Sequence, residues 1–240
     1  MLRQLSNLWH YGRLRTVSRT DRQNRPHFLL EFPDLEMSNL LELVISRYAR
    51  PDSEFCFIQI GAFDGRQADP LFQLVRQRKW KGVLVEPQPE AFALLQENYE
   101  AQPGLQYFNA AIGPQDGELT LYTRRDGATS IASVQRHLVV KPGFFRNEVV
   151  SFTAPCWTLT TLMDRANISG EVDLLQIDAE GFDYEIIRSI DFDRFAPTII
   201  RYEHQILSPR DRDECLRLLS KQGYRFYLED ADTTAVRLGF

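Results

Sequence analysis

The hydrophobic and polar positions form two kinds of pattern, which alternate along the chain. Short apolar runs that end at Gly, Asp, Glu or Asn predict buried strands, and segments with apolar residues three or four positions apart predict helices. The predicted strands are 55–60, 82–86, 105–109, 172–177 and 198–202. The predicted helices are 37–48, 67–78, 87–99, 159–166, 184–190 and 209–222.

This alternation predicts an α/β fold. Strands separated by single helices pair in parallel through right-handed crossovers, so the sheet should carry helices on both faces. Two further strands, 224–229 and 233–238, are separated by three residues. So short a connection predicts an antiparallel hairpin at the end of the chain.

The alternation breaks between about 114 and 157. Segments 117–123 and 149–157 have strand composition, and no helical pattern lies between them. They predict an inserted β-hairpin or flap that contains the polar loop 124–133. The insertion also holds two aromatic and two basic residues, which could form a wall against a sugar or could cover the edge of the sheet: Phe144, Phe145, Lys141 and Arg146.

Composition is that of a folded globular protein, with 43% hydrophobic and 25% charged residues in a chain of 240. No apolar run is long enough to span a membrane. Three cysteines, Cys56, Cys156 and Cys215, have neither disulfide-framework nor zinc-site spacing. They favour a reducing compartment and hence a cytoplasmic location.

Charge divides the chain into a basic N-terminal arm, 1–36, and a domain, 37–240. The net charge is −5, although arginines dominate the first 25 residues. In the arm, Leu2, Leu5, Leu8 and Trp9 recur at helical spacing, so the arm could contact an anionic membrane or a partner surface. It could equally pack on its own domain. The acidic remainder disfavours nucleic acid as a partner.

Polar or glycine residues follow five of the predicted strands. In an open parallel sheet, ligands bind beyond the carboxyl ends of the strands, where the strand order reverses. Ordinary turn chemistry is the alternative, because Gly, Asp and Asn favour turns in any fold. The candidates at these ends are Gln59, Gly61, Ala62, Asp64, Gly65, Glu86, Pro87, Asn109, Ala110, Asp178, Glu180, Glu203 and His204.

The first two strand ends suggest a nucleoside cofactor. Segment 59–65 contains glycines that allow close approach of a ligand, but it matches neither the dinucleotide pattern G-x-G-x-x-G nor a P-loop. Glu86 ends the second strand, where a carboxylate can accept hydrogen bonds from both hydroxyls of a ribose. A nucleoside with a short charged tail, such as S-adenosylmethionine, fits this pair better than NAD does.

The sequence resembles the FkbM-type S-adenosylmethionine-dependent methyltransferases over roughly residues 50–230. The matching segments are FIQIGAFDG (57–65), DP (69–70), WKGVLVEPQPEAF (80–92), NAAIG (109–113), DGELTLY (116–122), LLQIDAEGFDYEII (174–187) and IIRYEHQILS (199–208). The resemblance implies the class I methyltransferase fold: a Rossmann-like, seven-stranded, mostly parallel sheet with one antiparallel strand. It also implies O-methylation of sugars, glycolipids or natural products.

The resemblance assigns roles to the strand-end residues. It places Gly61, Asp64 and Gly65 around the methionyl and ribose portions of the cofactor, and Glu86 on the ribose hydroxyls. Asn109 and Ala110 should border the adenine. The sequence departs from the family at Gln59, where many relatives have an acidic residue that contacts the methionine amino group.

The remaining strand ends suggest the chemistry of the acceptor. A hydroxyl must lose its proton as it is methylated, and imidazole is the commonest base near neutral pH. We therefore expect His204 to be the base, with Asp178 or Glu180 orienting it and Glu203 beside it. The same carboxylates could instead hold Mg²⁺ or Ca²⁺, which favour oxygen ligands, although we expect no metal.

Two further residues are weaker candidates. Asp69 precedes Pro70 and could cap a helix or take part in catalysis. His137 lies in the flap, where it could contact substrate or simply be solvated.

Two functions compete with that of an O-methyltransferase. One is a catalytically degenerate methyltransferase fold that binds the cofactor as a sensor or scaffold. The other is an NAD-dependent sugar-modifying enzyme, which would need the missing glycine fingerprint. A protein or a nucleic acid could also replace the small-molecule or glycan acceptor, and the oligomeric state is open.

Overall fold

The computed structural model describes residues 40–100, 102–125, 131–140, 148–229 and 231–238. The chain divides into two units after Leu43, and both sheets and the site described below lie in the second unit. The basic arm and the aromatic and basic residues of the flap, Lys141, Phe144, Phe145 and Arg146, lie outside the described residues.

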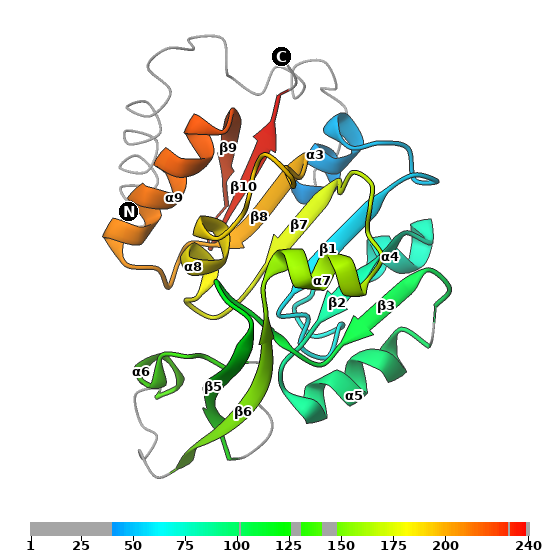
Figure 1. Cartoon of the computed structure of the whole chain (residues 1–240). Helices are drawn as coiled ribbons and strands as arrows, with labels where there is room; N and C mark the ends of the chain where they lie inside the picture. Colours follow the sequence, from blue (N-terminus) through cyan, green and yellow to red (C-terminus); the bar gives the residue numbers. More distant parts are fainter. Residues whose placement is uncertain (1–39, 101, 126–130, 141–147, 230, 239–240) are drawn as a thin grey trace, which may run out of the picture. The chain divides into compact units, whose positions relative to one another are not determined.

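A seven-stranded sheet forms the centre of the second unit (Figure 1). The strands in their order across the sheet are β3 (Leu105–Phe108), β2 (Lys81–Val85), β1 (Cys56–Ile60), β7 (Leu174–Ile177), β8 (Ile199–Glu203), β10 (Asp232–Arg237) and β9 (Tyr224–Leu228). All neighbours pair in parallel except β10, which is antiparallel to β8 and to β9. The predicted mostly parallel sheet with a terminal antiparallel hairpin is confirmed.

Helices connect the strands and lie on both faces of the sheet. Figure 1 shows α7 and α8 in front of it and α4 behind it. The helices are α3 (Leu40–Tyr48), α4 (Phe72–Arg78), α5 (Pro89–Asn98), α6 (Arg136–Val139), α7 (Leu159–Arg165), α8 (Asp183–Arg188) and α9 (Pro209–Lys221).

The sequence pattern predicted that helix α5 begins at Pro87, but the helix begins at Pro89. Gln88 stays extended, with φ −76° and ψ 117°. The ring of a proline disfavours helical geometry in the residue before it, so Gln88 cannot be helical. Pro89 can, because the first helical position needs no N–H donor. The two residues Pro87 and Gln88 therefore remain available to line a binding site.

The core lies on both faces of the sheet. Ile58, Leu175 and Ile200 pack in one cluster with residues of α7, α8 and α9. Phe57 and Leu174, whose side chains alternate with these along the strands, are fully buried as well. Burial on both faces explains why the central strands are nearly continuous apolar runs.

A second sheet of three strands forms the insertion, with β6 (Val149–Trp157) between β4 (Ala111–Ile112) and β5 (Gly117–Arg124). Strands β5 and β6 pair antiparallel from Gly117 opposite Cys156 to Arg124 opposite Val149, which confirms the predicted hairpin. The sequence did not predict β4, which has two residues, or α6, which has four. Figure 1 shows the hairpin beyond the carboxyl ends of the parallel strands.

Strand order reverses between β1 and β7, since the chain moves from β1 outward to β3 and then returns to the other side of β1. Such a reversal opens a crevice at the carboxyl ends of the strands. Within the described ranges, no helix combines the length and the apolar character that crossing a membrane requires.

Candidate functional site

One cavity opens at the carboxyl ends of β1, β2 and β7, where the strand order reverses. It gathers residues from the loops that follow these three strands, from the segment after β3 and from the inserted sheet. The candidates from the sequence that line it are Gln59, Gly61, Ala62, Glu86, Pro87, Ala110, Asp178 and Glu180.

Gly61 allows the ends of β1 and β7 to touch. Its backbone has a φ of +75°, and a Cβ there would lie 1.8 Å from the carbonyl oxygen of Asp178. The N–H groups of Gly61 and Ala62 both donate to the carbonyl of Val85, at 2.9 and 3.1 Å. A residue without a side chain is therefore required where three strands converge.

Glu86 lies in the cavity wall with both carboxyl oxygens fixed. Oε2 accepts the N–H of Phe63 at 2.8 Å, and Oε1 accepts the N–H of Gln88 at 2.8 Å. The residue is 3% exposed, and burial raises the pKa of its carboxyl to about 7. The side chain of Gln88 also hydrogen-bonds this carboxyl group, and the acceptor sites that remain on its oxygens can take hydrogen bonds from a ligand.

Gln59 brings an unsatisfied acceptor to the same cavity. It is 3% exposed, and its Oε1 has no hydrogen-bond partner. Its side chain also hydrogen-bonds the carboxyl group of Asp69, which holds the amide oxygen away from Asp69. A buried acceptor without a partner costs free energy, so a ligand that donates a hydrogen bond here would relieve it.

Asp69 both caps a turn and lines the cavity. Oδ1 accepts the N–H of Leu71 at 2.7 Å, and Oδ2 lies 3.5 Å from the hydroxyl of Tyr99, which donates to it. Burial raises the pKa of this carboxyl to about 6. Asp69 therefore combines the two roles that the sequence left open, a cap and a cavity residue.

Asp178 follows β7 and lines the cavity. Loss of hydration and the nearby charge of Asp232 raise its pKa to about 6, and Arg201 opposes this rise. Glu180, two residues on, has a φ of +48°. Its backbone oxygen accepts a hydrogen bond from Oγ of Ser133 at 2.7 Å.

Asp64, Gly65 and Asn109 are not among the residues that line the cavity. Oδ1 of Asp64 accepts the N–H groups of Arg66 and Gln67, at 2.9 and 2.7 Å, and so closes the turn after β1. A Cβ on Gly65 would lie 2.4 Å from Leu95, so this glycine allows α5 to pack closely. Nδ2 of Asn109 donates to the backbone oxygen of Glu86 at 2.8 Å.

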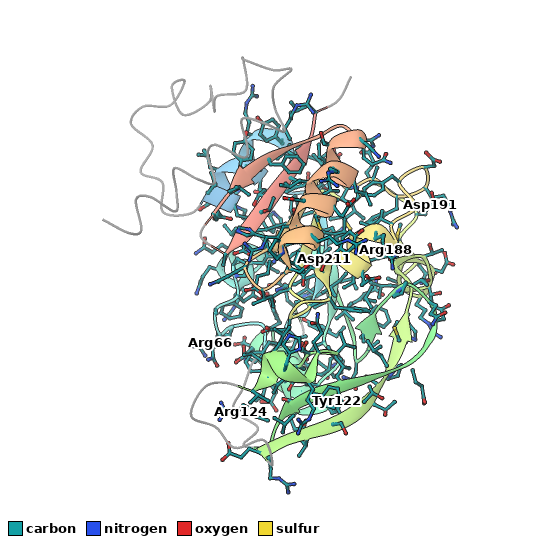
Figure 2. All side chains as sticks on the ribbon, turned by 90° about the vertical axis from the view of Figure 1, so that its left-hand side faces the viewer. Arg66, Tyr122, Arg124, Arg188, Asp191 and Asp211 are labelled. Carbon is teal, nitrogen blue, oxygen red and sulfur yellow. The ribbon has the colours of Figure 1, made fainter. Side chains whose placement is uncertain are left out.

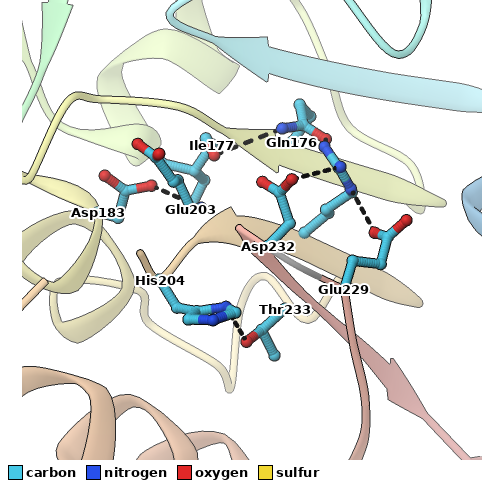
Figure 3. A network of polar contacts seen from close by, with 9 residues as sticks. Gln176, Ile177, Asp183, Glu203, His204, Glu229, Asp232 and Thr233 are labelled. Atoms are coloured by element: carbon cyan, nitrogen blue, oxygen red, sulfur yellow. Dashed lines mark hydrogen bonds and ion pairs between the residues drawn. The ribbon is translucent and has the colours of Figure 1, made fainter. Parts of the chain in front are cut away.

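Glu203 and His204 point to opposite sides of the chain (Figure 3). They are consecutive at the end of β8, and successive side chains of a strand alternate between its faces. Nδ1 of His204 lies 3.1 Å from Oγ1 of Thr233, in hydrogen-bond contact, and the residue is 6% exposed. Neither residue lines the cavity, and neither does His137, which is exposed on α6.

The inserted sheet covers the cavity with apolar residues. The lining residues from β5 and from the segment before α6 are Leu119, Leu121, Ala132 and Val134. Polar contacts hold this cover: Oγ1 of Thr123 donates to Oε1 of Gln88 at 3.1 Å, and Nε2 of Gln135 donates to the carbonyl of Gly181 at 3.0 Å. Figure 2 shows Tyr122 and Arg124 on the same hairpin.

Several residues of the site were missed by sequence reasoning. Gln88 and Gln176 line the cavity, and Ser133 holds its cover. The alternation of Leu119 and Leu121 in β5 was a detectable signal, because it marks one face of a strand as apolar. Ser133 gave no such signal, since its role depends on the fold of a loop.

Metal ligation finds no support in the residues that the structure describes, among which no group of three or more His, Cys, Asp or Glu side chains is arranged to hold a metal ion.

Comparison with known proteins gives a match to one family. The model of the methyltransferase FkbM domain matches residues 59–226. No curated protein matches the chain in sequence.

Similar solved structures include an FkbM methyltransferase from Methylobacillus flagellatus KT, at 13% identity over 80% of this chain and 49% of that one, with a TM-score of 0.48. The chain thus spans about half the length of that protein. A precorrin-6y C5,15-methyltransferase from Geobacter metallireducens GS-15 is 11% identical over 81% of this chain and 87% of its own, with a TM-score of 0.43. A human methyltransferase 10 domain containing protein is 13% identical over 82% of this chain and 78% of its own, with a TM-score of 0.42.

Proposed function

The chain belongs to the FkbM methyltransferase family, and from that premise we propose that it transfers a methyl group from S-adenosylmethionine to a hydroxyl oxygen. The acceptor we propose is a sugar, a glycolipid or a natural product. The proposal rests on two acceptors that line one cavity where the strand order reverses. They are the carboxyl group of Glu86 and the unsatisfied Oε1 of Gln59.

These residues fit the hydrogen-bond donors of the cofactor. Glu86 retains acceptor capacity for the two ribose hydroxyls, and Oε1 of Gln59 can accept from the methionine ammonium group. Asp69 adds a negative charge on the same side of the cavity. The neutral Gln59 thus keeps an acceptor where many relatives have an acid, and Asp69 supplies the charge.

NAD fits less well. The turn after β1 lacks the glycine pattern that lets a backbone cradle a pyrophosphate. Asp69 also lines this part of the cavity, and its carboxylate would repel a pyrophosphate when ionised. An NAD-dependent enzyme is therefore the weaker candidate.

When bound, S-adenosylmethionine supplies an electrophilic methyl carbon on a sulfonium. Glu86 and Gln59 would hold this cofactor, and the methyl carbon would then be open to an acceptor hydroxyl in the same cavity. The hydroxyl proton must go to a base, and Asp178 is our assignment, because it lines the cavity whereas His204 does not. A base in position contributes about 10²–10⁴-fold.

The apolar cover has a second role in this mechanism. Leu119, Leu121 and Val134 exclude water from the wall that they form. Lower hydration strengthens the attraction between the Asp178 carboxylate and the proton that it receives.

We also propose a cytoplasmic location. Cys56, Cys156 and Cys215 are all free thiols, which agrees with a reducing compartment. The scaffold alternative shares the cofactor site and differs in having no turnover, so methyl transfer separates the two.

Calorimetric titration with S-adenosylmethionine and, separately, with NAD tests the proposal. We expect micromolar binding of the first, and a loss of at least about tenfold in affinity for Glu86→Ala, since hydrogen bonds to a charged group contribute about 1.5–3 kcal/mol. Glu90→Ala, an exposed position on α5, is the matched control. Tighter binding of NAD than of S-adenosylmethionine would overturn the assignment.

A further inference from the structure

We propose that the acceptor carries a protonated amine beside the hydroxyl that is methylated, as an amino sugar does, and that Glu203 binds this amine. The inference rests on the proposed methyl transfer and names the class of its substrate. It starts from the charges at the carboxyl ends of β7, β8 and β10.

Three carboxyl groups act on one another at these strand ends. Asp178 follows β7, Glu203 ends β8 and Asp232 begins β10. The pKa of Glu203 is raised to about 7 by burial and by the charges of Asp178 and Asp232. Asp178 also lines the cavity, so this negative region adjoins the place where the acceptor must enter.

Arg201 is the cation that acts on this region, and it is already engaged. Its NH2 group lies 2.6 Å from Asp232, and its Nε lies 3.1 Å from Glu229. NH1 donates to Oε1 of Gln176 at 3.3 Å. The side chain is 11% exposed, and these contacts hold it in place.

Glu203 has no such partner. Its carboxyl group makes neither a hydrogen bond nor an ion pair with any residue of the described ranges, and the nearby charges that act on it are negative. Its side chain is half-buried, so water compensates it only in part. A carboxylate in this position is a ready acceptor for an ammonium group.

The buried side chain of Asp183, next to Glu203, independently points to a ligand. It is fully buried, and Oδ1 accepts the backbone N–H of Glu203 at 3.1 Å. Oδ2 has no partner. Figure 3 shows the carboxyl group of Asp183 next to that of Glu203. Burial and the charges of Asp178 and Glu203 raise the pKa of this carboxyl well above its ordinary value. An ammonium group with three N–H donors would offset these negative charges and supply a hydrogen bond to the orphaned oxygen.

The same charges disfavour other acceptors. A phosphate or carboxylate near Glu203 would be repelled by the negative charges of Asp178 and Asp232. A neutral hydroxyl neighbour would leave the negative region uncompensated. The carboxylates then divide the work, with Asp178 taking the hydroxyl proton and Glu203 holding the amine.

The test compares glucosamine with N-acetylglucosamine, in which an acetyl group turns the charged amine into a neutral amide. Each is titrated calorimetrically into protein saturated with S-adenosylhomocysteine. We expect glucosamine to bind at least about tenfold more tightly, and Glu203→Gln, which keeps the side-chain shape, to abolish the preference. Glu203→Asp should retain part of it. Glu118→Gln, exposed on β5, is the control variant and should keep the full preference.

Methyl transfer to the two sugars is then followed with labelled S-adenosylmethionine, and the same order of kcat/KM is expected. Equal or tighter binding of N-acetylglucosamine, or an unchanged preference in Glu203→Gln, would overturn the inference. Failure of S-adenosylmethionine to bind would instead reject the proposed function, so the two failures are distinguishable.

Discussion

Gly61 and Asp178 are in direct backbone contact across the point where the strand order reverses: a Cβ on Gly61 would lie 1.8 Å from the carbonyl oxygen of Asp178. This contact joins the loop that follows β1 to the loop that presents the proposed base. The geometry of the cofactor side and that of the acceptor side are therefore coupled through one glycine.

Gly61→Ala should disrupt this contact. The φ of +75° costs a non-glycine residue about 1–2 kcal/mol, and the steric overlap adds to that. We expect the free energy of unfolding to fall by at least about 2 kcal/mol and affinity for S-adenosylmethionine to fall with it. Urea denaturation and calorimetry measure the two effects.

The control is Gly170→Ala, where a Cβ would meet no atom within 4 Å. Its unfolding free energy should stay within about 0.5 kcal/mol of the parent protein. Similar stability of the two variants would contradict the importance of the Gly61 contact.

The identity of the base can be read from the pH dependence of kcat at saturating cofactor. Asp178 has a pKa raised to about 6, so kcat should rise through about pH 6 and then level off. Asp178→Asn should lower kcat by about 10²–10⁴-fold and remove this rise.

His204→Gln should keep the rise near pH 6, because its imidazole contacts Thr233 and does not line the cavity. We expect it to cost about 1 kcal/mol of stability through the lost hydrogen bond. The opposite pattern, with kcat collapsing in His204→Gln and surviving in Asp178→Asn, would assign the base to His204.

Stability of the unliganded protein should fall as pH rises. The folded-state pKa values of Glu86 and Glu203 are raised to about 7, above the ordinary value of a glutamate. The folded state therefore binds more protons than the unfolded state between about pH 4.5 and 7, so the free energy of unfolding decreases across this window and is level above it.

Urea denaturation at about pH 5 and about pH 7.5 checks this, with an expected difference on the order of 1–3 kcal/mol. Glu86→Gln should reduce the slope, because it removes one of the groups that titrate. A free energy of unfolding that increases between these two pH values would contradict the prediction.

Ser133 should control the release of the cofactor. Its fully buried hydroxyl donates to the backbone oxygen of Glu180 at 2.7 Å and accepts the N–H of Gln135 at 3.0 Å, so it holds the cover of the cavity. Loss of these bonds in Ser133→Ala should speed dissociation of S-adenosylmethionine by about tenfold. Stopped-flow fluorescence measures the rate, and Ser151→Ala, exposed on β6, should leave it unchanged.

Substitution of Asp69 should weaken only those ligands that carry the amino acid tail of S-adenosylmethionine. Because it pairs with Gln59 on the side proposed for the methionine ammonium group, Asp69→Asn should weaken S-adenosylmethionine by about tenfold. 5′-Methylthioadenosine has no amino acid tail, so its affinity should not change. Equal weakening of both ligands would show that Asp69 acts on the structure of the cavity as a whole.

The amino-acid sequence by itself determined the elements and the first half of the site. Nearly continuous apolar runs such as 55–60 encode buried strands, because parallel strands are covered on both faces. Glu86 and Asp178 could be selected from position alone, since the carboxyl ends of parallel strands meet at one edge.

Only the tertiary structure decided which of the candidates share a cavity. Glu203 and His204 are adjacent in the sequence, yet the alternation of a strand sends their side chains to opposite sides. Asp64 bonds its own turn, and Ser133 reaches Glu180 across 47 positions. Side-chain direction and contacts between distant segments depend on register and packing, which no local pattern of residues encodes.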